Sequence, residues 1–114
     1  MKINTKLDQI ITDVTTGMNG ILGDKLHKII LYGSYARGDF NRDSDVDIMA
    51  LADISEDERR EIQKKIDKVA SDVSLERDIT VSISLRSLAM YKKRVEYVPF
   101  YRNVHTEGVE IYAS

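Results

Sequence analysis

The sequence predicts an α/β fold of one domain, in which a small mixed sheet carries helices packed against it. Apolar runs of strand length alternate along the chain with longer segments whose apolar residues repeat at three- and four-residue steps. Glycines and short polar stretches separate these segments. The chain has 114 residues, of which 42% are hydrophobic, and this suits one core rather than two. We therefore treat residues 1–114 as a single domain.

The first segment, residues 3–22, predicts an amphipathic helix. Its apolar residues fall on one helical face: Ile3, Leu7, Ile10, Ile11, Val14, Met18 and Ile21. Gly17 and Gly20 weaken the second half of this helix, and Gly23 is the expected stop, because glycine readily ends a helix.

Two strands with a turn between them are expected next. Residues 27–32 form a short β-rich run that predicts a buried strand. Residues 33–38 predict a tight turn into a short helix that is closed by glycine, and residues 39–44 predict a polar loop. Residues 45–52 predict a second strand, whose first residues alternate between acidic and apolar side chains.

The second half of the chain begins with a clear helix signal. Ser55 and Glu58 have the spacing of a capping box. An apolar stripe follows: Ile62, Ile66, Val69, Ala70 and Val73. Residues 78–85 then alternate polar and apolar side chains, which predicts a third strand.

The last third predicts helix and an edge strand. A helix is expected over residues 87–96, an interruption at Pro99, a short helical turn over 100–106 and an edge strand over 109–112. Several apolar side chains in this part fit either core packing or a face for a partner: Met90, Tyr91, Tyr97, Phe100 and Tyr101.

Charge and cysteine content limit the classes of function. The formal net charge is -2, so the chain has no overall basic footprint for a nucleic-acid backbone. The absence of cysteine excludes disulfides, thiolate chemistry and Cys-based zinc sites. His27 and His105 are expected to be ordinary surface or half-buried residues. Since no apolar run approaches a membrane span or a signal peptide, we expect a cytoplasmic protein.

The residues that carry chemistry are a Gly-Ser pair and, ten residues later, an Asp-x-Asp pair. Gly33 and Ser34 follow a strand; glycine permits close backbone approach, and N–H groups at the start of a helix favour phosphate. Asp45 and Asp47 point to one face of the next strand, about 6.6–6.8 Å apart. Such carboxylates repel each other unless a cation lies between them, and Mg²⁺ prefers oxygen ligands. The pattern predicts a metal–triphosphate site.

Asp78 is the predicted third acid of this site. It begins the strand expected over 78–85, so only the fold can bring it beside Asp45 and Asp47. Three carboxylates can hold two metal ions, which activate an attacking hydroxyl and stabilise the leaving oxygen. Two nearby acids fit the strand face less well: Asp72 and Glu76.

Residues 33–38, Gly-Ser-Tyr-Ala-Arg-Gly, followed by residues 44–48, Ser-Asp-Val-Asp-Ile, resemble the DNA polymerase β-like nucleotidyltransferase superfamily. The resemblance is greatest to its smallest members, the minimal nucleotidyltransferase (MNT) domains, and the order of helices and strands extends it along nearly the whole chain. It implies a polymerase β-like fold. The implied site residues are Asp45, Asp47 and Asp78 as catalytic metal ligands, Gly33 and Ser34 at the phosphates, Arg37 near the triphosphate, Ser44 at the nucleotide and, more weakly, Arg42.

The same resemblance implies a reaction and a partner. An acceptor hydroxyl would attack the α-phosphate of ATP or another nucleoside triphosphate in line, with two Mg²⁺ ions bound, and pyrophosphate would leave. Minimal members are commonly encoded with a HEPN-domain toxin, and some transfer AMP to a tyrosine of that toxin and so act as antitoxins. Larger relatives carry further domains that bind the acceptor. Because this chain ends at Ser114, the acceptor would be held by an open cleft, by another subunit of a homo- or hetero-oligomer, or by the acceptor protein itself, which favours a protein acceptor over a small drug or a long RNA.

Two other functions remain open from the sequence. The chain is also compatible with a non-catalytic antitoxin whose vestigial nucleotide site leaves it to neutralise a partner by binding. An aminoglycoside-type nucleotidyltransferase is the less favoured third reading. The presence of all three acids favours the enzyme.

Overall fold

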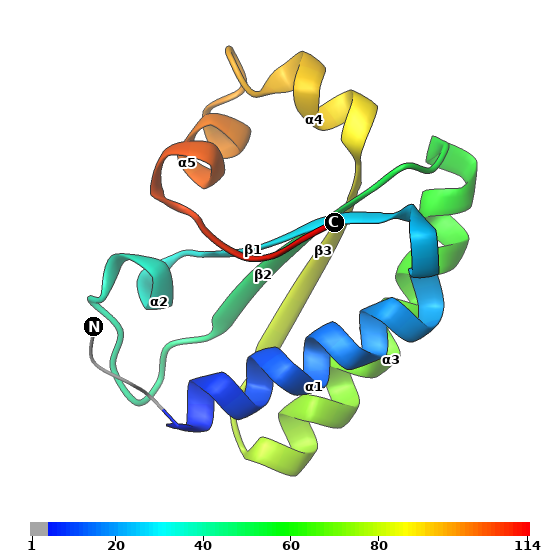
Figure 1. Ribbon diagram of the computed structural model, residues 1–114. Helices are drawn as coiled ribbons and strands as arrows, with labels where there is room; N and C mark the ends of the chain where they lie inside the picture. Colours follow the sequence, from blue (N-terminus) through cyan, green and yellow to red (C-terminus); the bar gives the residue numbers. More distant parts are fainter. Residues whose placement is uncertain (1–4) are drawn as a thin grey trace.

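A computed structural model describes residues 5–114, which form a four-stranded mixed sheet with helices on both faces (Figure 1). The strands are β1 (Leu26–Tyr32), β2 (Val46–Ala52), β3 (Val81–Ser87) and β4 (Val109–Ala113). They lie in the order β3-β2-β1-β4. β1 pairs antiparallel with β2 and β4, whereas β3 lies parallel to β2. The predicted α/β class and mixed sheet are confirmed.

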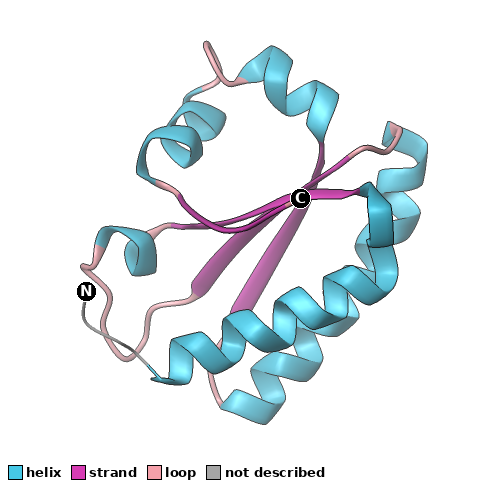
Figure 2. Cartoon of the chain, viewed as in Figure 1, coloured by secondary structure: helices cyan, strands magenta, loops and turns pink. Residues whose placement is uncertain are grey.

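Helices form a layer on each side of this sheet. They are α1 (Thr5–Leu22), the 3₁₀ helix η1 (Gly23–Lys25), α2 (Ser34–Arg37), α3 (Glu56–Arg77), α4 (Leu88–Arg94) and α5 (Pro99–Glu107). α1 and α3 lie side by side on one face, and α4 and α5 lie over the other (Figure 2). Within residues 5–114, no helix combines the length and apolar character that a membrane span requires.

The first helix follows the predicted stripe, with Ile10, Val14 and Met18 fully buried against the sheet and α3. The predicted start at Ile3 lies outside the described residues. Gly17 has a packing role that its helix propensity does not suggest. A Cβ at this position would lie 2.7 Å from Cγ1 of Val69, so the missing side chain allows α1 and α3 to approach closely.

α3 begins with the predicted capping box. The Ser55 hydroxyl accepts a hydrogen bond from the Glu58 N–H at 3.2 Å, and the Glu58 carboxylate accepts one from the Ser55 N–H at 3.1 Å. The Glu58 carboxylate also pairs with Lys25 at 2.8 Å, which ties the start of α3 to η1. These contacts, that with Lys25 foremost, lower the pKa of Glu58 to about 2.

Replacing Glu58 with Gln is expected to destabilise the fold in a pH-dependent way. The folded-state pKa lies below the ordinary value of 4.5, so the carboxylate stabilises the fold above pH 4.5 and loses this effect as the pH falls towards 2. Thermal melts of Glu58→Gln and wild type should therefore differ at pH 7 and converge near pH 2. Glu61→Gln on the same exposed helix face is the control, and an equal difference at both pH values would contradict the assignment.

The third strand starts later than the sequence predicts, and the predicted placement of Asp78 on it is wrong. α3 continues to Arg77, and Asp78 ends the helix in the left-handed conformation, with φ of 54° and its N–H bonded to the Ser74 carbonyl. The strand begins only at Val81, which pairs with Val46. The polar-apolar alternation runs unbroken through this turn, so it does not mark where pairing begins.

The last third of the chain matches its predicted elements. Pro99 is the first residue of α5, a position where its missing N–H leaves no helix hydrogen bond unmade. Tyr91 and Tyr101 are buried and pack edge to face, with ring centroids 5.8 Å apart, so core packing explains both. Tyr97 and Phe100 remain 66% and 40% exposed.

Candidate functional site

The Gly-Ser corner lies directly against the acid pair. β1 ends at Tyr32, and Gly33 turns the chain into α2 with φ of 74° and ψ of −156°, a conformation essentially reserved for glycine. A Cβ at this position would lie 2.6 Å from Oδ2 of Asp47. Glycine is therefore required here twice, by the backbone conformation and by the neighbouring carboxylate.

The turn that follows is closed by its own backbone. The Gly33 carbonyl accepts hydrogen bonds from the N–H groups of Ala36 and Arg37, each at 3.1 Å. Gly38 ends α2 in the left-handed conformation and donates its N–H to the Ser34 carbonyl at 2.9 Å. The helix therefore begins at Ser34, beside Asp47, where its N-terminal N–H groups suit an anion.

Asp45 and Asp47 flank the start of β2, which begins one residue later than the sequence predicts. β2 begins at Val46, so Asp45 precedes the strand and is exposed, while Asp47 is half-buried on it. Burial raises the pKa of Asp47, and the negative charge of Asp45 raises it further, whereas Arg37 opposes both effects. A charged acid pair under this repulsion is a fitting site for a hard divalent cation such as Mg²⁺.

The neighbour of Asp47 on β3 is a serine. Across three strands, Tyr32 is paired with Asp47, and Asp47 with Ser82, so the three side chains point to one face of the sheet. Ser82 thus occupies the position beside Asp47 from which a third strand-borne carboxylate would complete the site. Nothing in the sequence pattern marks this position, because it depends on the register between β2 and β3.

Asp78 does not take that position. It lies exposed at the end of α3, before the strand begins. Within the described residues 5–114, no three Asp, Glu, His or Cys side chains are grouped closely enough to hold a metal ion. Asp45, Asp47 and Asp78 thus form no three-acid group among the described residues, Ser82 lies beside Asp47, and the metal-binding roles of the three acids stay predictions.

A cleft of about 410 Å³ lies between α5 and the Gly-Ser corner with Asp47. Its lining comprises Tyr32, Gly33, Ser34, Arg37, Asp47, Phe100, Asn103, Val104 and Glu107. The rings of Tyr32 and Phe100 meet edge to face at 5.7 Å across it. The sequence analysis missed the contribution of α5, because only the tertiary fold brings residues 100–107 to the Gly-Ser corner. The exposed aromatic at Phe100 was its one signal.

Arg37 links the corner to α5 at the rim of this cleft. Its Nε lies 3.2 Å from a carboxylate oxygen of Asp39, and its Nη1 lies 3.5 Å from one of Glu107. All three side chains are substantially exposed, so these pairs contribute little to stability. A triphosphate in the cleft can therefore compete for the guanidinium.

Ser44 shapes the loop before the acid pair and lies outside the lining of the cleft. Its hydroxyl accepts a hydrogen bond from the Asn41 N–H at 2.9 Å, and the Asn41 side chain accepts one from the Asp43 N–H at 2.8 Å. Arg42 is exposed on the same loop. The structure thus gives Ser44 a role in fixing the chain ahead of Asp45.

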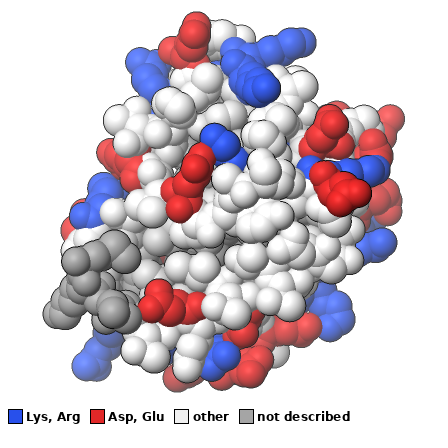
Figure 3. Space-filling model, in the orientation of Figure 1, with Lys and Arg blue, Asp and Glu red and all other residues white. Residues whose placement is uncertain are grey.

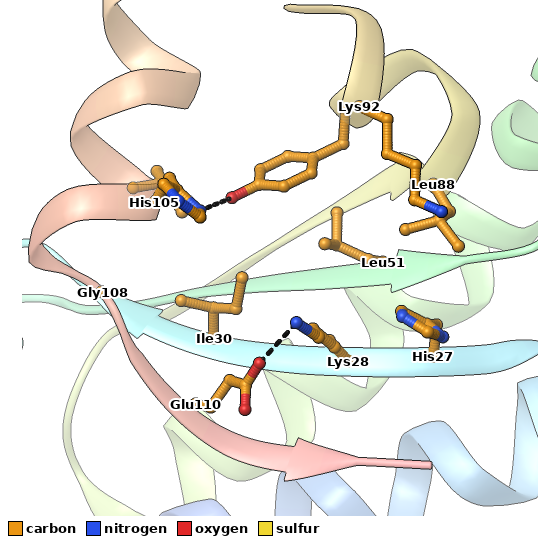
Figure 4. A pocket seen from close by; sticks show the side chains of 11 residues that line it. His27, Lys28, Ile30, Leu51, Leu88, Lys92, His105, Gly108 and Glu110 are labelled. Atoms are coloured by element: carbon orange, nitrogen blue, oxygen red, sulfur yellow. Dashed lines mark hydrogen bonds and ion pairs between the residues drawn. The ribbon is translucent and has the colours of Figure 1, made fainter. Parts of the chain in front are cut away.

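A second cavity, of about 380 Å³, lies farther along β1 beneath α4 and α5 (Figure 4). Lys28 pairs with Glu110 at 2.6 Å, and the Tyr91 hydroxyl lies 3.4 Å from Nδ1 of His105. Among the described residues that line it, Glu110 is the one carboxylate, so it has no acid pair for a metal. His27 is half-buried and His105 exposed, as predicted.

The surface has mixed charge. On the face shown in Figure 3, acidic and basic side chains are interspersed and no broad basic area stands out. This agrees with the net charge of -2.

Comparisons with known proteins agree with this geometry. A family model described as a nucleotidyltransferase domain matches residues 20–101, which include the Gly-Ser corner, the acid pair and β3. A relative from Methanocaldococcus jannaschii, named "Putative protein adenylyltransferase MJ0141", is 39% identical over 103 residues. That match covers 90% of this chain and 96% of the relative.

Solved structures share the fold. A "putative nucleotidyltransferase" from Sulfolobus solfataricus matches with a TM-score of 0.61 at 16% identity, over 98% of this chain and 90% of that one. A structure of a tri-AMPylated Shewanella oneidensis HEPN toxin in complex with MNT antitoxin matches with a TM-score of 0.53 at 19% identity, over 94% of this chain and 72% of that one. At such identities these matches show a common fold.

Proposed function

Because this chain belongs to the nucleotidyltransferase domain family, we propose that it transfers AMP from ATP to a hydroxyl group of a protein acceptor. The observation that carries the proposal is the contact between the Gly-Ser corner and the acid pair. Gly33, Ser34, Arg37 and Asp47 line one cleft, with the Gly33 backbone against the Asp47 carboxylate. Phosphate-binding and metal-binding groups thus lie within reach of one triphosphate.

Four residues at or beside the cleft have a part in this reaction. Asp45 and Asp47 would hold Mg²⁺, which neutralises charge on the triphosphate and the pyrophosphate. The N-terminal turn of α2 at Ser34 would orient the β- and γ-phosphates, and Arg37 would offset charge on the leaving group. A bond forms between the acceptor oxygen and the α-phosphorus, the bond from that phosphorus to the β-bridging oxygen breaks, and the hydroxyl proton passes to water.

We place the acceptor hydroxyl on a tyrosine of a HEPN-type partner protein, which makes this chain an antitoxin. The named activity of the 39%-identical relative and the fold shared with the MNT antitoxin support this choice. To test it, the chain is incubated with ATP labelled at the α-phosphate, Mg²⁺ and a HEPN-domain protein as the candidate partner. Label on a tyrosine of that protein supports the proposal, and tight binding without label contradicts it.

A second function, nucleotide-dependent binding without transfer, is favoured by one observation. Ser82 lies beside Asp47 where a third carboxylate would complete a two-metal site. A chain with only two acids could bind a metal–nucleotide and neutralise its partner by contact alone. The labelling experiment separates this function from transfer, since it predicts a stable complex with unmodified partner.

Replacing Ser82 with Asp is expected to raise the rate of transfer by about tenfold, because it adds a third oxygen ligand beside Asp47. Ser82 is exposed, so the fold should tolerate the change. The measurement is the initial rate of label transfer at saturating ATP and Mg²⁺. Ser82→Asn has the same size without the charge and should show no gain; equal rates in both variants would contradict the expected role of the carboxylate.

A further inference from the structure

A third pocket, of about 230 Å³, lies at the end of β3 that is farther from the cleft. Four elements meet there: the first turn of α3, the end of β3, α4 and α5. Its lining is Glu56, Arg59, Arg86, Ser87, Met90, Arg94 and Tyr101. We call it the arginine pocket, after Arg59, Arg86 and Arg94.

The arginine pocket has an excess of positive charge. Glu56 is the one carboxylate among the described lining residues, and it pairs with Arg59. Arg86 donates a hydrogen bond to the Leu85 carbonyl at 3.1 Å. Within residues 5–114, neither Arg86 nor Arg94 forms an ion pair with a carboxylate. Arg59 foremost, and also the charges of Arg60 and Arg86, lower the pKa of Glu56, so the three guanidinium groups of the pocket share one carboxylate in a chain whose net charge is -2. Guanidinium groups bind carboxylates and phosphates in a fixed fork geometry.

The pocket and the cleft share one face of the sheet. Alternate residues of β3 point the same way, so Ser82 beside Asp47 and Arg86 lie on that face. Tyr32 is close enough to both sites to feel their charges. Burial raises its pKa and a hydrogen bond with Ser84 lowers it, while the charge of Asp47 raises it and the charge of Arg86 lowers it. At about 3.3 Å per residue, the path from Ser82 to Arg86 is about 13 Å long.

A ligand on this path would lie along β3, where Ser82 is exposed and Ser84 and Arg86 are half-buried, at the margin of the face that α4 and α5 cover. β3 is an edge strand, but side chains of α3 already occupy its open edge. Gln63 accepts a hydrogen bond from the Leu85 N–H at 2.9 Å and donates one to the Ile83 carbonyl at 3.0 Å. Ser74 accepts one from the Val81 N–H at 2.9 Å. An added strand would have to compete with these contacts.

We infer that the arginine pocket binds an acidic side chain of the protein segment that presents the acceptor hydroxyl to the acid pair. This inference rests on the proposed function. In an extended segment, about 13 Å corresponds to four residues, so the acidic residue lies about four positions from the one that carries the hydroxyl. The pocket thus selects acceptors by charge, at a distance from the reacting atoms.

The test uses two fluorescein-labelled probe peptides on the full chain without ATP. One reads Ala-Tyr-Ser-Ala-Ala-Glu-Ala, and the other has Gln in place of Glu. The variant is Arg86→Gln with Arg94→Gln, and the matched control is Arg60→Gln with Lys93→Gln, which removes two positive charges from residues outside the pocket lining. Fluorescence anisotropy gives the Kd of each pair at fixed ionic strength.

We expect wild type and control to bind the Glu peptide about tenfold tighter than the Gln peptide, and the variant to bind both alike. Equal Kd values for the two peptides on wild type, or a preference that persists in the variant, would overturn the inference. A peptide with phosphoserine in place of Glu that binds more than about tenfold tighter than the Glu peptide would make phosphate, rather than carboxylate, the ligand of the pocket and would also overturn the inference.

Three further measurements separate a folding defect and a failure of the proposed function from a loss of peptide preference. Arg94 is exposed, so Arg94→Gln alone provides a folded variant if the double substitution unfolds, and it should lose part of the preference. ATP binding is measured on every variant and should not change. Because peptide binding is measured without ATP, failure to label any acceptor would refute the proposed function and leave the binding result intact.

Discussion

Replacing Asp47 with Asn is expected to lower the rate of nucleotide transfer by at least about 100-fold and to leave the fold intact. The substitution keeps the size of the side chain and its place against Gly33, but removes the charge that would hold Mg²⁺. Burial and the nearby charge of Asp45 raise the pKa of Asp47, so the ionised carboxylate is disfavoured in the folded chain without metal. The melting temperature of Asp47→Asn at pH 7 in EDTA should therefore equal or exceed that of wild type.

The control for this prediction is Asp43→Asn. Asp43 is an exposed acid two residues before Asp45, and its substitution also removes one negative charge. Its transfer rate should match that of wild type. If Asp47→Asn retained full transfer, or if it lost transfer only because it unfolded, the assignment of Asp47 to the metal would be wrong.

Replacing Gly33 with Ala is expected to lower the free energy of unfolding by about 2 kcal/mol or more and to abolish transfer. Two effects add here. The backbone φ of 74° with ψ of −156° is strained for alanine, and the new methyl group would lie 2.6 Å from the Asp47 carboxylate. Relief of that clash must move either the corner or the acid, so the phosphate and metal groups lose their alignment. Urea unfolding and label transfer measure the two effects.

Two other glycines separate these effects. Gly38 has φ of 84° with open space around its Cβ position, so Gly38→Ala carries backbone strain of about 1 kcal/mol without a clash. Gly20 lies within α1 and also has open space, so Gly20→Ala should stabilise by about 0.5–1 kcal/mol. If Gly33→Ala behaved like Gly38→Ala in both assays, the close contact between Gly33 and Asp47 would not be needed for transfer.

The sequence predicts best those features that neighbouring residues decide. The capping box at Ser55 and Glu58 needs only a spacing of three and helical backbone, and it is present. The β2 prediction differs from the observed strand by only one residue, at its start, because a run of apolar residues bounded by acids is a local signal. The alternation from Asp78 onwards is equally local, yet α3 extends to Arg77 and the turn at Asp78 precedes pairing. A pattern of period two does not report which of its residues have a partner strand.

The residues of the candidate site show the same difference between local and tertiary features. Gly33, Ser34 and Asp47 come from one continuous motif that joins two adjacent strands, so the sequence could place them together. Ser82 reaches Asp47 only through the parallel register of β2 and β3, which depends on the packing of α3 between them in the chain. The wall formed by α5 depends on how the last third of the chain folds back over the sheet. Apart from the aromatic residue Phe100 on α5, neither has a local sequence signal.

The most direct measurement of the central claim is paramagnetic broadening of backbone amide signals by Mn²⁺ with ATP, with Mn²⁺ in place of Mg²⁺. If Asp45 and Asp47 hold the metal against the Gly-Ser corner, the signals of Gly33, Ser34 and Asp47 should disappear first in wild type and persist in Asp47→Asn. Broadening centred instead on Lys28 and His105, or unchanged by Asp47→Asn, would contradict the account.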